Sequence, residues 1–311
     1  MIRGVVRIYD LAMTHQLDAD DFFIHRVQQH CAEIHLNFFL VEPVWVERFY
    51  DKFERGKVWA RALLNMHSEH HQPEDIFHRL VRLAAQRKTF VIDPPDVALA
   101  AFNKARLHPL LVAARIQVPP TIIVAREQVG GFALSEEHRV LLGSPFVIKP
   151  SLGYGRRGVV VDATSERDLT RSAAAWPDAE YLLQRRIVPR TLQHSPAYFR
   201  VYFVFGAVWF CWWNCYTDRY RQATAAEMAE FGLQPLEELV RRIAALTGMK
   251  FFSSEIAQTE AGEFVVIDYV NDQCHMLSQS ANPQIGVPDE LVAAIARRLV
   301  EAAKENIAQA R

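Results

Sequence analysis

The sequence predicts an α/β (α+β) protein in which an N-terminal α/β layer precedes two α+β sub-domains. Three observations lead to this expectation. Strand-like and helix-like segments alternate over residues 1–95, as they do in a helix-covered parallel sheet. Later strand-like segments occur in adjacent pairs, around Gly206 and around residues 260–263, as expected for antiparallel hairpins. Between these regions, a glycine-rich loop separates two apolar stretches.

In the N-terminal layer, apolar runs and amphipathic patterns define the expected elements. Pro73 fits the first turn of its helix. We expect strands at 4–9 ("GVVRIY"), 34–42 ("IHLNFFLVE") and 89–95 ("TFVIDPP"), and helices at 20–33, 58–66 and 73–86.

The remaining two thirds of the chain show the same kinds of pattern, and we place domain boundaries at 1–95, 96–185 and 186–311. Gly248 suits the C-terminal end of a helix. Helices are expected at 96–114, 135–142, 167–175, 236–246 and 289–309. Strands are expected at 121–125, 145–150, 158–163, 180–188, in both halves of 201–216, and on either side of 260–263.

Composition limits the functional classes. The 311 residues are 50% hydrophobic and 23% charged, with a formal net charge of -1, so there is no global attraction to nucleic acid or anionic lipid. The apolar run at 201–216 is interrupted by Gly206-Ala207 and is expected to be a buried hairpin rather than a membrane span. The four cysteines form no C-x-x-C pair, and a reduced, cytoplasmic setting is the simplest expectation.

The loop "VIKPSLGYGRRGVVV" carries Gly153, Gly155 and Gly158 as G-x-G-x-x-G. A dinucleotide-binding loop would open a helix, yet three β-branched valines follow and favour a strand. Protein kinases also need H-R-D and D-F-G, and a Walker loop needs G-K-[ST]; the sequence has none of these.

What remains is a strand with Lys149 near its end, a glycine loop and a second strand. Glycines let backbone N–H groups approach phosphate oxygens, Lys149 supplies a positive charge and Ser151 a hydroxyl donor. The alternative is a tight hairpin with a surface lysine.

Four motifs follow one another along the chain: "FNKARLHPLLVAARIQVPPTIIV", the loop itself, "EYLLQRRI" with "YFRVYFVFGAVWF", and "FFSSEIAQTEAGEFVVIDYVND". In this order they resemble the ATP-grasp superfamily, especially the branch of glutathione synthetase, the ribosomal-protein glutamate ligases and D-alanine–D-alanine ligase. The resemblance covers residues 96–272 in detail. It implies the ATP-grasp fold, in which the two α+β sub-domains grip ATP, with ATP and Mg²⁺ (or Mn²⁺) as cofactors.

The resemblance assigns roles by position. Lys104 and Lys149 would be the nucleotide lysines, with Ser151 and the three glycines in the phosphate loop. Arg200 would face the phosphates or an acyl intermediate. The hinge strand, whose backbone groups would read the adenine edge, is represented by Gln184, Arg185 and Ile187. The metal ligands would be Glu255, Asp268 and Asn271.

Two departures from the superfamily pattern are visible. Asp268 and Asn271 are three residues apart instead of two, so a bulge is needed to bring them to one face, or Asp272 replaces Asn271. The acidic residue expected on the ribose is replaced by "VPRTLQ", which leaves Gln193 or a backbone group for that contact.

Four other clusters have both a functional and a plain interpretation. His67, His70, His71 and His78 could bind zinc, but their irregular spacing favours a solvated loop leading into a helix. Cys211 and Cys215 are four residues apart, which on a strand places them on one face; they could form a metal site, but packing in the core is favoured. Arg219 and Arg221 follow the hairpin and could act on an anionic substrate or an acyl phosphate; Arg156 and Arg157 could form a lid contact; in both cases solvent-facing charge is the alternative.

The resemblance implies an ATP-dependent carboxylate–amine ligase that forms an amide or peptide bond through an acyl phosphate. Its partners would be small-molecule or peptide carboxylate and amine substrates, with a homodimer as the default assembly. Two alternatives are a small-molecule kinase on the same fold and a degenerate, non-catalytic nucleotide-binding module. No pattern in the sequence identifies the substrates.

Overall fold

The computed structural model describes residues 6–15, 21–67 and 72–309, and the chain divides into two compact units. The first unit comprises Met1–Leu99, Arg200–Ser253 and Asn271–Arg311, and the second comprises Ala100–Phe199 and Ser254–Val270. The three-part division at residues 95 and 185 stays a prediction.

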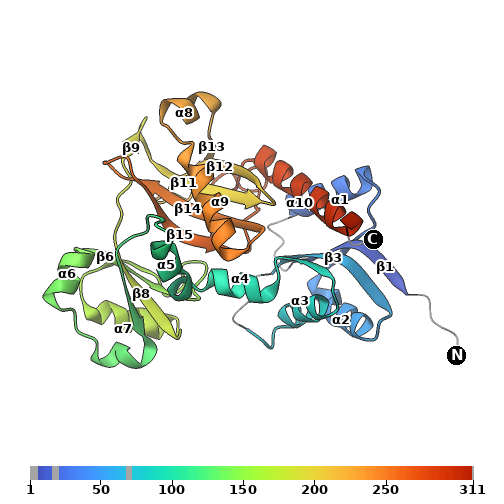
Figure 1. Ribbon diagram of the computed structural model, residues 1–311, viewed down its shortest axis with the longest axis horizontal. Helices are drawn as coiled ribbons and strands as arrows, with labels where there is room; N and C mark the ends of the chain where they lie inside the picture. The colour runs from blue at the N-terminus through green and yellow to red at the C-terminus, as the bar shows by residue number, and fades with distance from the viewer. Residues whose placement is uncertain (1–5, 16–20, 68–71, 310–311) are drawn as a thin grey trace. The chain divides into compact units, whose positions relative to one another are not determined.

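The first unit begins with a four-stranded sheet in the order β2-β1-β3-β4, in which all pairings are parallel (Figure 1). The parallel sheet confirms the predicted N-terminal α/β layer. Its strands are β1 (Arg7–His15), β2 (Phe38–Val41), β3 (Val58–Met66) and β4 (Phe90–Ile92).

Helices bury this sheet. α2 and α3 share a hydrophobic core with it through residues such as Phe49, Phe53 and Phe77. α10 contacts β1, β3 and β4 and packs against α1. The helices are α1 (Asp21–Glu33), α2 (Val46–Glu54), preceded by the short 3-10 helix η2 (Pro43–Trp45), α3 (Ile76–Gln86) and α10 (Asp289–Gln309).

The predicted helix at 58–66 is wrong, because this segment is strand β3. β3 lies between β1 and β4, and its last five residues are all buried. A strand buried on both faces loses the alternation of apolar and polar residues that identifies a strand in sequence. The alanines and leucines of "VWARALLNM" then read as helix formers, and tertiary burial overrides that propensity.

Two helix boundaries also differ from expectation. α3 begins at Ile76 rather than at Pro73, because the Asp75 side chain caps it by accepting from the backbone N–H groups of Phe77 and His78. The expected single helix at 96–114 is two helices, α4 (Pro95–Phe102) and α5 (Lys104–Ala113). Asn103 separates them and caps α5 by accepting from Arg106 N at 2.8 Å.

The second unit contains a four-stranded sheet in the order β5-β8-β6-β7, whose neighbouring strands are antiparallel. Leu142, Phe146, Leu169 and Tyr181 belong to its core. Its elements are β5 (Thr121–Ala125), the 3-10 helix η3 (Arg126–Gly131), α6 (Glu136–Leu142), β6 (Phe146–Pro150), β7 (Val160–Ala163), α7 (Glu166–Ala175) and β8 (Glu180–Arg185).

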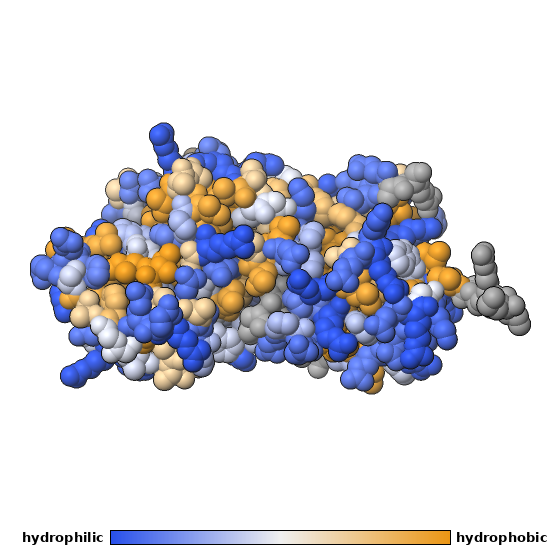
Figure 2. All heavy atoms as spheres, turned by 60° about the horizontal axis from the view of Figure 1, so that its bottom comes forward, coloured by the Kyte–Doolittle hydropathy of each residue, from blue (hydrophilic) through white to orange (hydrophobic). Residues whose placement is uncertain are grey.

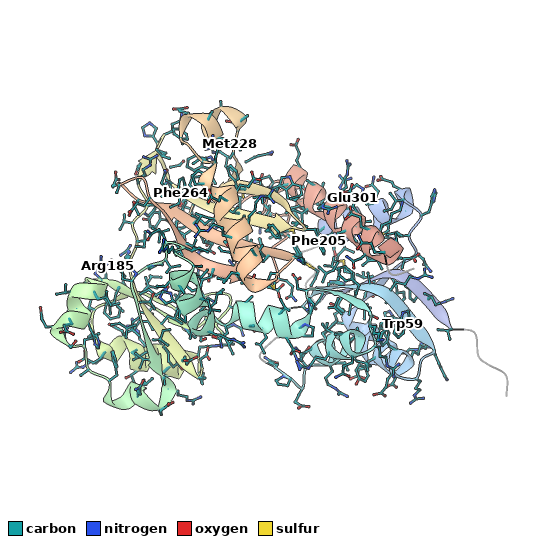
Figure 3. All side chains as sticks on the ribbon, in the orientation of Figure 1. Trp59, Arg185, Phe205, Met228, Phe264 and Glu301 are labelled. Atoms are coloured by element: carbon teal, nitrogen blue, oxygen red, sulfur yellow. The ribbon has the colours of Figure 1, made fainter. Side chains whose placement is uncertain are left out.

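A five-stranded sheet follows in the order β13-β12-β11-β14-β15. The expected hairpin is confirmed: β11 and β12 are joined by Phe205 and Gly206 (Figure 3). Both residues have positive φ, which a two-residue turn needs in order to match the twist of the strands it connects. The strands are β11 (Tyr198–Val204), β12 (Ala207–Trp213), β13 (Tyr220–Gln222), β14 (Phe251–Gln258) and β15 (Phe264–Asn271), beside a small hairpin of β9 (Thr191–Leu192) and β10 (Ser195–Pro196).

None of the helices in the described ranges is both long enough and apolar enough to span a bilayer. On the face drawn in Figure 2, hydrophobic and hydrophilic residues are intermingled.

Two further helices complete the first unit: α8 (Ala225–Glu230) and α9 (Pro235–Thr247). Gly248 ends α9 in the left-handed conformation at φ 79°, as predicted for a glycine stop. At the start of α8, Glu227 accepts from the backbone N–H of Thr224 and forms an ion pair with Arg221 at 2.7 Å. The hydrogen bond from Arg221 lowers the pKa of the Glu227 carboxyl to about 2.

We expect Glu227→Gln to reduce the free energy of unfolding by about 1–2 kcal/mol at pH 7, after allowance for the half-exposed Arg221. Because the folded-state pKa is lowered, the contribution is complete above the ordinary pKa of 4.5 and disappears as the pH falls toward 2. Urea denaturation from pH 7 to pH 2 measures it. Glu238→Gln on α9 is the matched control, and an equal loss in both variants, or a loss that persists at pH 2, would contradict the assignment.

Candidate functional site

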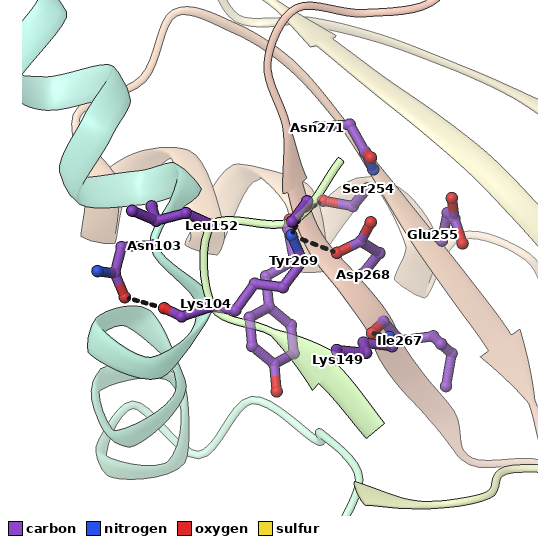
Figure 4. Close-up of polar contacts among 12 residues, drawn as sticks. Asn103, Lys104, Lys149, Leu152, Ser254, Glu255, Ile267, Asp268, Tyr269 and Asn271 are labelled. Carbon is purple, nitrogen blue, oxygen red and sulfur yellow. Dashed lines mark hydrogen bonds and ion pairs between the residues drawn. The ribbon is translucent and has the colours of Figure 1, made fainter. Parts of the chain in front are cut away.

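Lys149 lies at the end of β6, where the glycine loop begins. Its Nζ donates to the carbonyl oxygen of Ile267 at 2.8 Å (Figure 4). Burial lowers the pKa of the Lys149 ammonium, while the carboxylates of Asp268 and Glu255 act in the opposite direction. The structure therefore places a half-buried cation beside two carboxylates, all within the second unit.

Lys104 is the first residue of α5 and is buried. Its Nζ donates to the carbonyl oxygen of Gly153 at 3.0 Å and lies 3.8 Å from Asp268 Oδ1 (Figure 4). One lysine thus connects the glycine loop with a predicted metal ligand. The two lysines predicted from sequence do come together around Asp268.

The two predicted carboxylates stand on neighbouring strands, Glu255 on β14 and Asp268 on β15. Both are half-buried, and Glu255 Oε2 accepts from the Tyr198 hydroxyl at 3.0 Å. Oxygen ligands of this kind suit Mg²⁺, which is usually held by one or two carboxylates together with substrate phosphates. No cluster of three or more His, Cys, Asp or Glu suited to a metal occurs among the described residues. The donor set therefore fits a metal that a phosphate helps to hold; that Glu255 and Asp268 are its protein ligands stays a prediction.

Asn271 and Asp272 lie in the first unit. Asn271 is the last residue of β15 and its Nδ2 donates to the Ser253 carbonyl oxygen at 3.3 Å. Asp272 is buried, and its charge contributes to raising the pKa of Asp93, after the larger effect of burial. Which of the two completes the metal site stays a prediction.

The glycine loop joins β6 to β7, so the strand predicted after Gly158 is confirmed and no helix follows. Gly155 and Gly158 adopt φ values of 57° and 70°. A Cβ at Gly158 would lie 2.5 Å from Trp176 Cβ and 2.8 Å from Pro150 Cγ, so this glycine is required both by conformation and by space. Arg157 stacks over Trp176 and Tyr154, which gives it a definite place in the loop.

Ser151 has a different environment from the one expected. It is buried, its hydroxyl donates to Asn103 Oδ1 at 2.7 Å, and it accepts from the backbone N–H of Ala105 at 3.3 Å. These bonds attach the loop to the start of α5, where Lys104 stands. The geometry supports a role in positioning Lys104 more directly than a contact with phosphate.

The predicted hinge residues have distinct environments. Gln184 is buried, and its Nε2 donates to Thr121 Oγ1 at 3.0 Å and to the Tyr269 hydroxyl at 2.7 Å. Arg185 donates from its side chain to the carbonyl oxygens of Val140 and Leu141 at the end of α6 (Figure 3). Ile187 follows β8 and is half-buried. Their adenine contacts stay predictions.

The predicted arginines belong to the first unit. Arg200 is buried, with its guanidinium 4.9 Å from the centroid of a Trp213 ring and Nη1 3.4 Å from Ser253 Oγ. Arg219 donates to Gln284 Oε1 at 2.9 Å and is exposed. Arg221 is held by the Glu227 pair and lies 5.0 Å from a Trp212 ring, so a structural role explains its geometry. A role for any of them in catalysis stays a prediction.

The other clusters lie apart from these residues in sequence. His67 Nε2 is 3.1 Å from Asp75 Oδ1, whereas His70 and His71 lie outside the described residues. Cys211 is buried in β12 and burial raises the pKa of its thiol to about 12, as expected of a core cysteine. Cys215 lies beyond the end of β12, so the two cysteines do not share a strand face.

Two groups of residues escaped sequence analysis. His108 Nδ1 lies 2.6 Å from the Tyr269 hydroxyl, so α5, β8 and β15 meet in one buried network with Gln184. Asp178 accepts from the backbone N–H of Leu152 at 2.6 Å and fixes the start of the glycine loop. The alternation of side chains along β15 would have predicted that Tyr269 and Asp268 lie on opposite faces of the strand. No local pattern around "WPDAE" predicts the contact between Asp178 and the loop.

Comparison with solved structures decides the fold. The chain matches D-alanine–D-alanine ligase from Bacillus anthracis in complex with ATP over 98% of both chains, with a TM-score of 0.63 and 13% identity. It has an ATP-grasp fold. The RimK domain protein from Sphaerobacter thermophilus is similar over 94% of this chain and 98% of that one (TM-score 0.61, 17% identity). The ATP-grasp ligase PsnB, complexed with precursor peptide and AMPPNP, is similar over 98% and 99% (TM-score 0.62, 13% identity).

No protein-family profile matches the chain, and no curated protein sequence matches it. At these low sequence identities, the similarity to the solved structures concerns the backbone fold alone. It confirms the fold expected from the four ordered motifs and leaves the chemistry to be argued from the residues above.

We expect Gly158→Ala to lower the free energy of unfolding by about 2–4 kcal/mol, because it combines a positive φ with overpacking against Trp176 and Pro150. Gly155→Ala is the matched control: its φ is also positive but no atom lies within 4 Å of the added Cβ, and a loss of about 1 kcal/mol is expected. Chemical denaturation compares them. Equal losses would show that the close packing seen at Gly158 does not exist.

Proposed function

We propose that the protein is an ATP-dependent carboxylate–amine ligase that forms an amide or peptide bond. The observation that carries the proposal is the grouping of Lys104, Lys149, Glu255 and Asp268 in one partly buried region of the second unit. Similar folds in D-alanine–D-alanine ligase and PsnB, one complexed with ATP and the other with AMPPNP and a peptide, support it. On this basis the substrates are amino acids or peptides.

The proposed reaction has two steps. An oxygen of the substrate carboxylate attacks the γ-phosphorus of ATP, and the bond between that phosphorus and the β,γ-bridging oxygen breaks, which gives an acyl phosphate and ADP. An amine then attacks the acyl carbon, phosphate leaves, and the amine loses a proton. A bound Mg²⁺ would supply charge neutralisation at the phosphate oxygens.

The chain's own residues contribute orientation and charge. Lys104 and Lys149 would hold the phosphates at the start of the glycine loop, because the Lys104 ammonium group contacts the Gly153 carbonyl oxygen and Lys149 ends the strand that leads into the loop. Partial burial strengthens these interactions, since fewer water molecules compete for the same oxygens. The loop glycines would let backbone N–H groups approach the phosphates, and the loop would shield the acyl phosphate from water.

ATP with Mg²⁺ should bind to the wild-type protein, and Lys149→Ala should weaken binding at least about tenfold, because a half-buried cation proposed to contact the phosphates is lost. Isothermal titration calorimetry measures both affinities. Lys304→Ala removes the same charge from an exposed position on α10 and should bind normally. Absence of binding to the wild-type protein would contradict the proposed ATP-dependent activity.

Asp268→Asn should abolish most of the effect of Mg²⁺ on ATP affinity, because a neutral amide is a weaker magnesium ligand. Titrations with and without Mg²⁺ give this effect directly, independent of turnover. Glu263→Gln, exposed just before the same strand, is the matched control. An unchanged magnesium effect in Asp268→Asn would remove this carboxylate from the metal site.

Ligase and kinase differ in their products. A ligase releases ADP and phosphate only with both a carboxylate and an amine, and hydroxylamine should intercept its acyl phosphate as a hydroxamate. A kinase releases ADP without phosphate and gives no hydroxamate. Screening amino acids and short peptides as carboxylate donors with hydroxylamine therefore tests the reaction class before the natural amine is known.

A further inference from the structure

A concave site lies in the N-terminal part of the first unit, apart in sequence from the candidate site described above. Its volume is about 560 Å³, within the roughly 300–1,000 Å³ that is typical of small-molecule pockets. Arg7, Lys57 and Val58 line it from the beginning of β1 and β3, and Phe39 from edge strand β2. The pocket therefore starts at the amino ends of β1 and β3 and runs along edge strand β2, whose Leu40 and the following Glu42 also line it.

One face of the α2 region forms the other wall. Trp45, Arg48, Phe49 and Lys52 all line the pocket and follow the three- to four-residue spacing of one helical face. Trp45 remains 47% exposed, and the Arg48 guanidinium lies 5.9 Å from a Trp45 ring centroid. A large aromatic surface and a cation are thus presented together.

The floor of the pocket is aromatic. The rings of Tyr9 and Phe39 stack with centroids 4.6 Å apart, and those of Phe39 and Phe49 at 5.2 Å. The stack continues through Phe53 to Trp59 (Figure 3). This row fixes the floor, since each ring is packed on the next, and leaves the half-buried Phe39 as a preformed flat surface.

The charges around this floor are unbalanced. Four cations line the pocket, Arg7, Arg48, Lys52 and Lys57, against one carboxylate, Glu42. Within the described part of the chain, no carboxylate oxygen lies within ion-pair distance of any of the four. Arg55, just past the end of α2, differs: it pairs with Asp51 at 3.9 Å.

We propose that this pocket binds a small organic anion consisting of a flat aromatic ring and a carboxylate or similar anionic group. The ring would lie against Phe39 and Trp45, and the anion would be held by Arg48 and its neighbouring cations. Such a site is separate from the nucleotide and metal residues in sequence and does not depend on the proposed ligase activity. It gives the protein a means of responding to a second molecule.

The test is calorimetric titration of the full chain with 2-naphthoate. Saturable one-to-one binding is expected, with its neutral analogue 2-naphthamide and the ring-less acetate each at least about tenfold weaker, since each lacks one of the two recognised features. Binding of all three alike, or no saturable binding of naphthoate up to millimolar concentration, would overturn the proposal.

Variants locate the site. Trp45→Ala and Arg48→Ala should each weaken naphthoate binding about five- to tenfold, and both residues are exposed, so the fold should survive, as circular dichroism can verify. Arg55→Ala, an arginine next to the same helix outside the pocket, should have no effect. Equal effects of Arg48→Ala and Arg55→Ala, or none of Trp45→Ala, would place the ligand elsewhere.

Analytical ultracentrifugation tests whether a second copy of the chain, rather than a small molecule, occupies the pocket. A dimer of the wild-type protein that Arg48→Glu dissociates, with naphthoate failing to bind either form, would show that a second copy of the chain covers this face and would overturn the small-molecule assignment. A monomer, or a dimer that Arg48→Glu leaves intact, agrees with an open pocket.

Discussion

The arrangement of the second unit depends on the balance of two cations and two anions in a region with restricted access to water. Lys149 is stabilised by the Ile267 carbonyl oxygen and by two carboxylates, and burial alone would favour its neutral form. Lys104 and Asp268 are 3.8 Å apart. Removing any one of the four charges would leave the others with an uncompensated cost of desolvation. This explains why hydrogen bonds and an ion pair connect the loop, α5 and β15 so closely.

Backbone contacts reinforce the electrostatic ones. Ser151 is bonded to Asn103, and its carbonyl oxygen accepts from the backbone N–H of Lys104 at 3.0 Å. The Asn103 side chain also caps α5. A single polar cluster therefore sets the position of the helix, of its lysine and of the loop. It also explains why a continuous helix at 96–114 would not serve here, since the break at Asn103 creates the N-terminus on which Lys104 stands.

Much of the fold could be predicted because its signals are local. Valines after Gly158 showed that a strand follows, Gly206 marked the hairpin and Gly248 the end of α9. Val58–Met66 was misread because burial on both faces removed the alternation that reveals a strand. In the candidate site, the charged residues were identified by type and order. The Tyr269 network and Asp178 were missed because their partners are distant in sequence. The pocket beside α2 was missed too, since it combines residues of several elements.

The glycine loop is held at both ends: the backbone N–H of Leu152 donates to Asp178, and the carbonyl oxygen of Gly158 accepts from the Ser172 hydroxyl. Only residues 153–157 lie between these anchors. Five residues span at most about 17 Å when extended, so a flap folded back on itself reaches roughly 8 Å. Such a short segment can make a small local movement but not a large closing movement. If the proposed ligase activity holds, any bulky part of a substrate would be enclosed by other segments, so those segments and not the loop would set the size range of acceptable substrates.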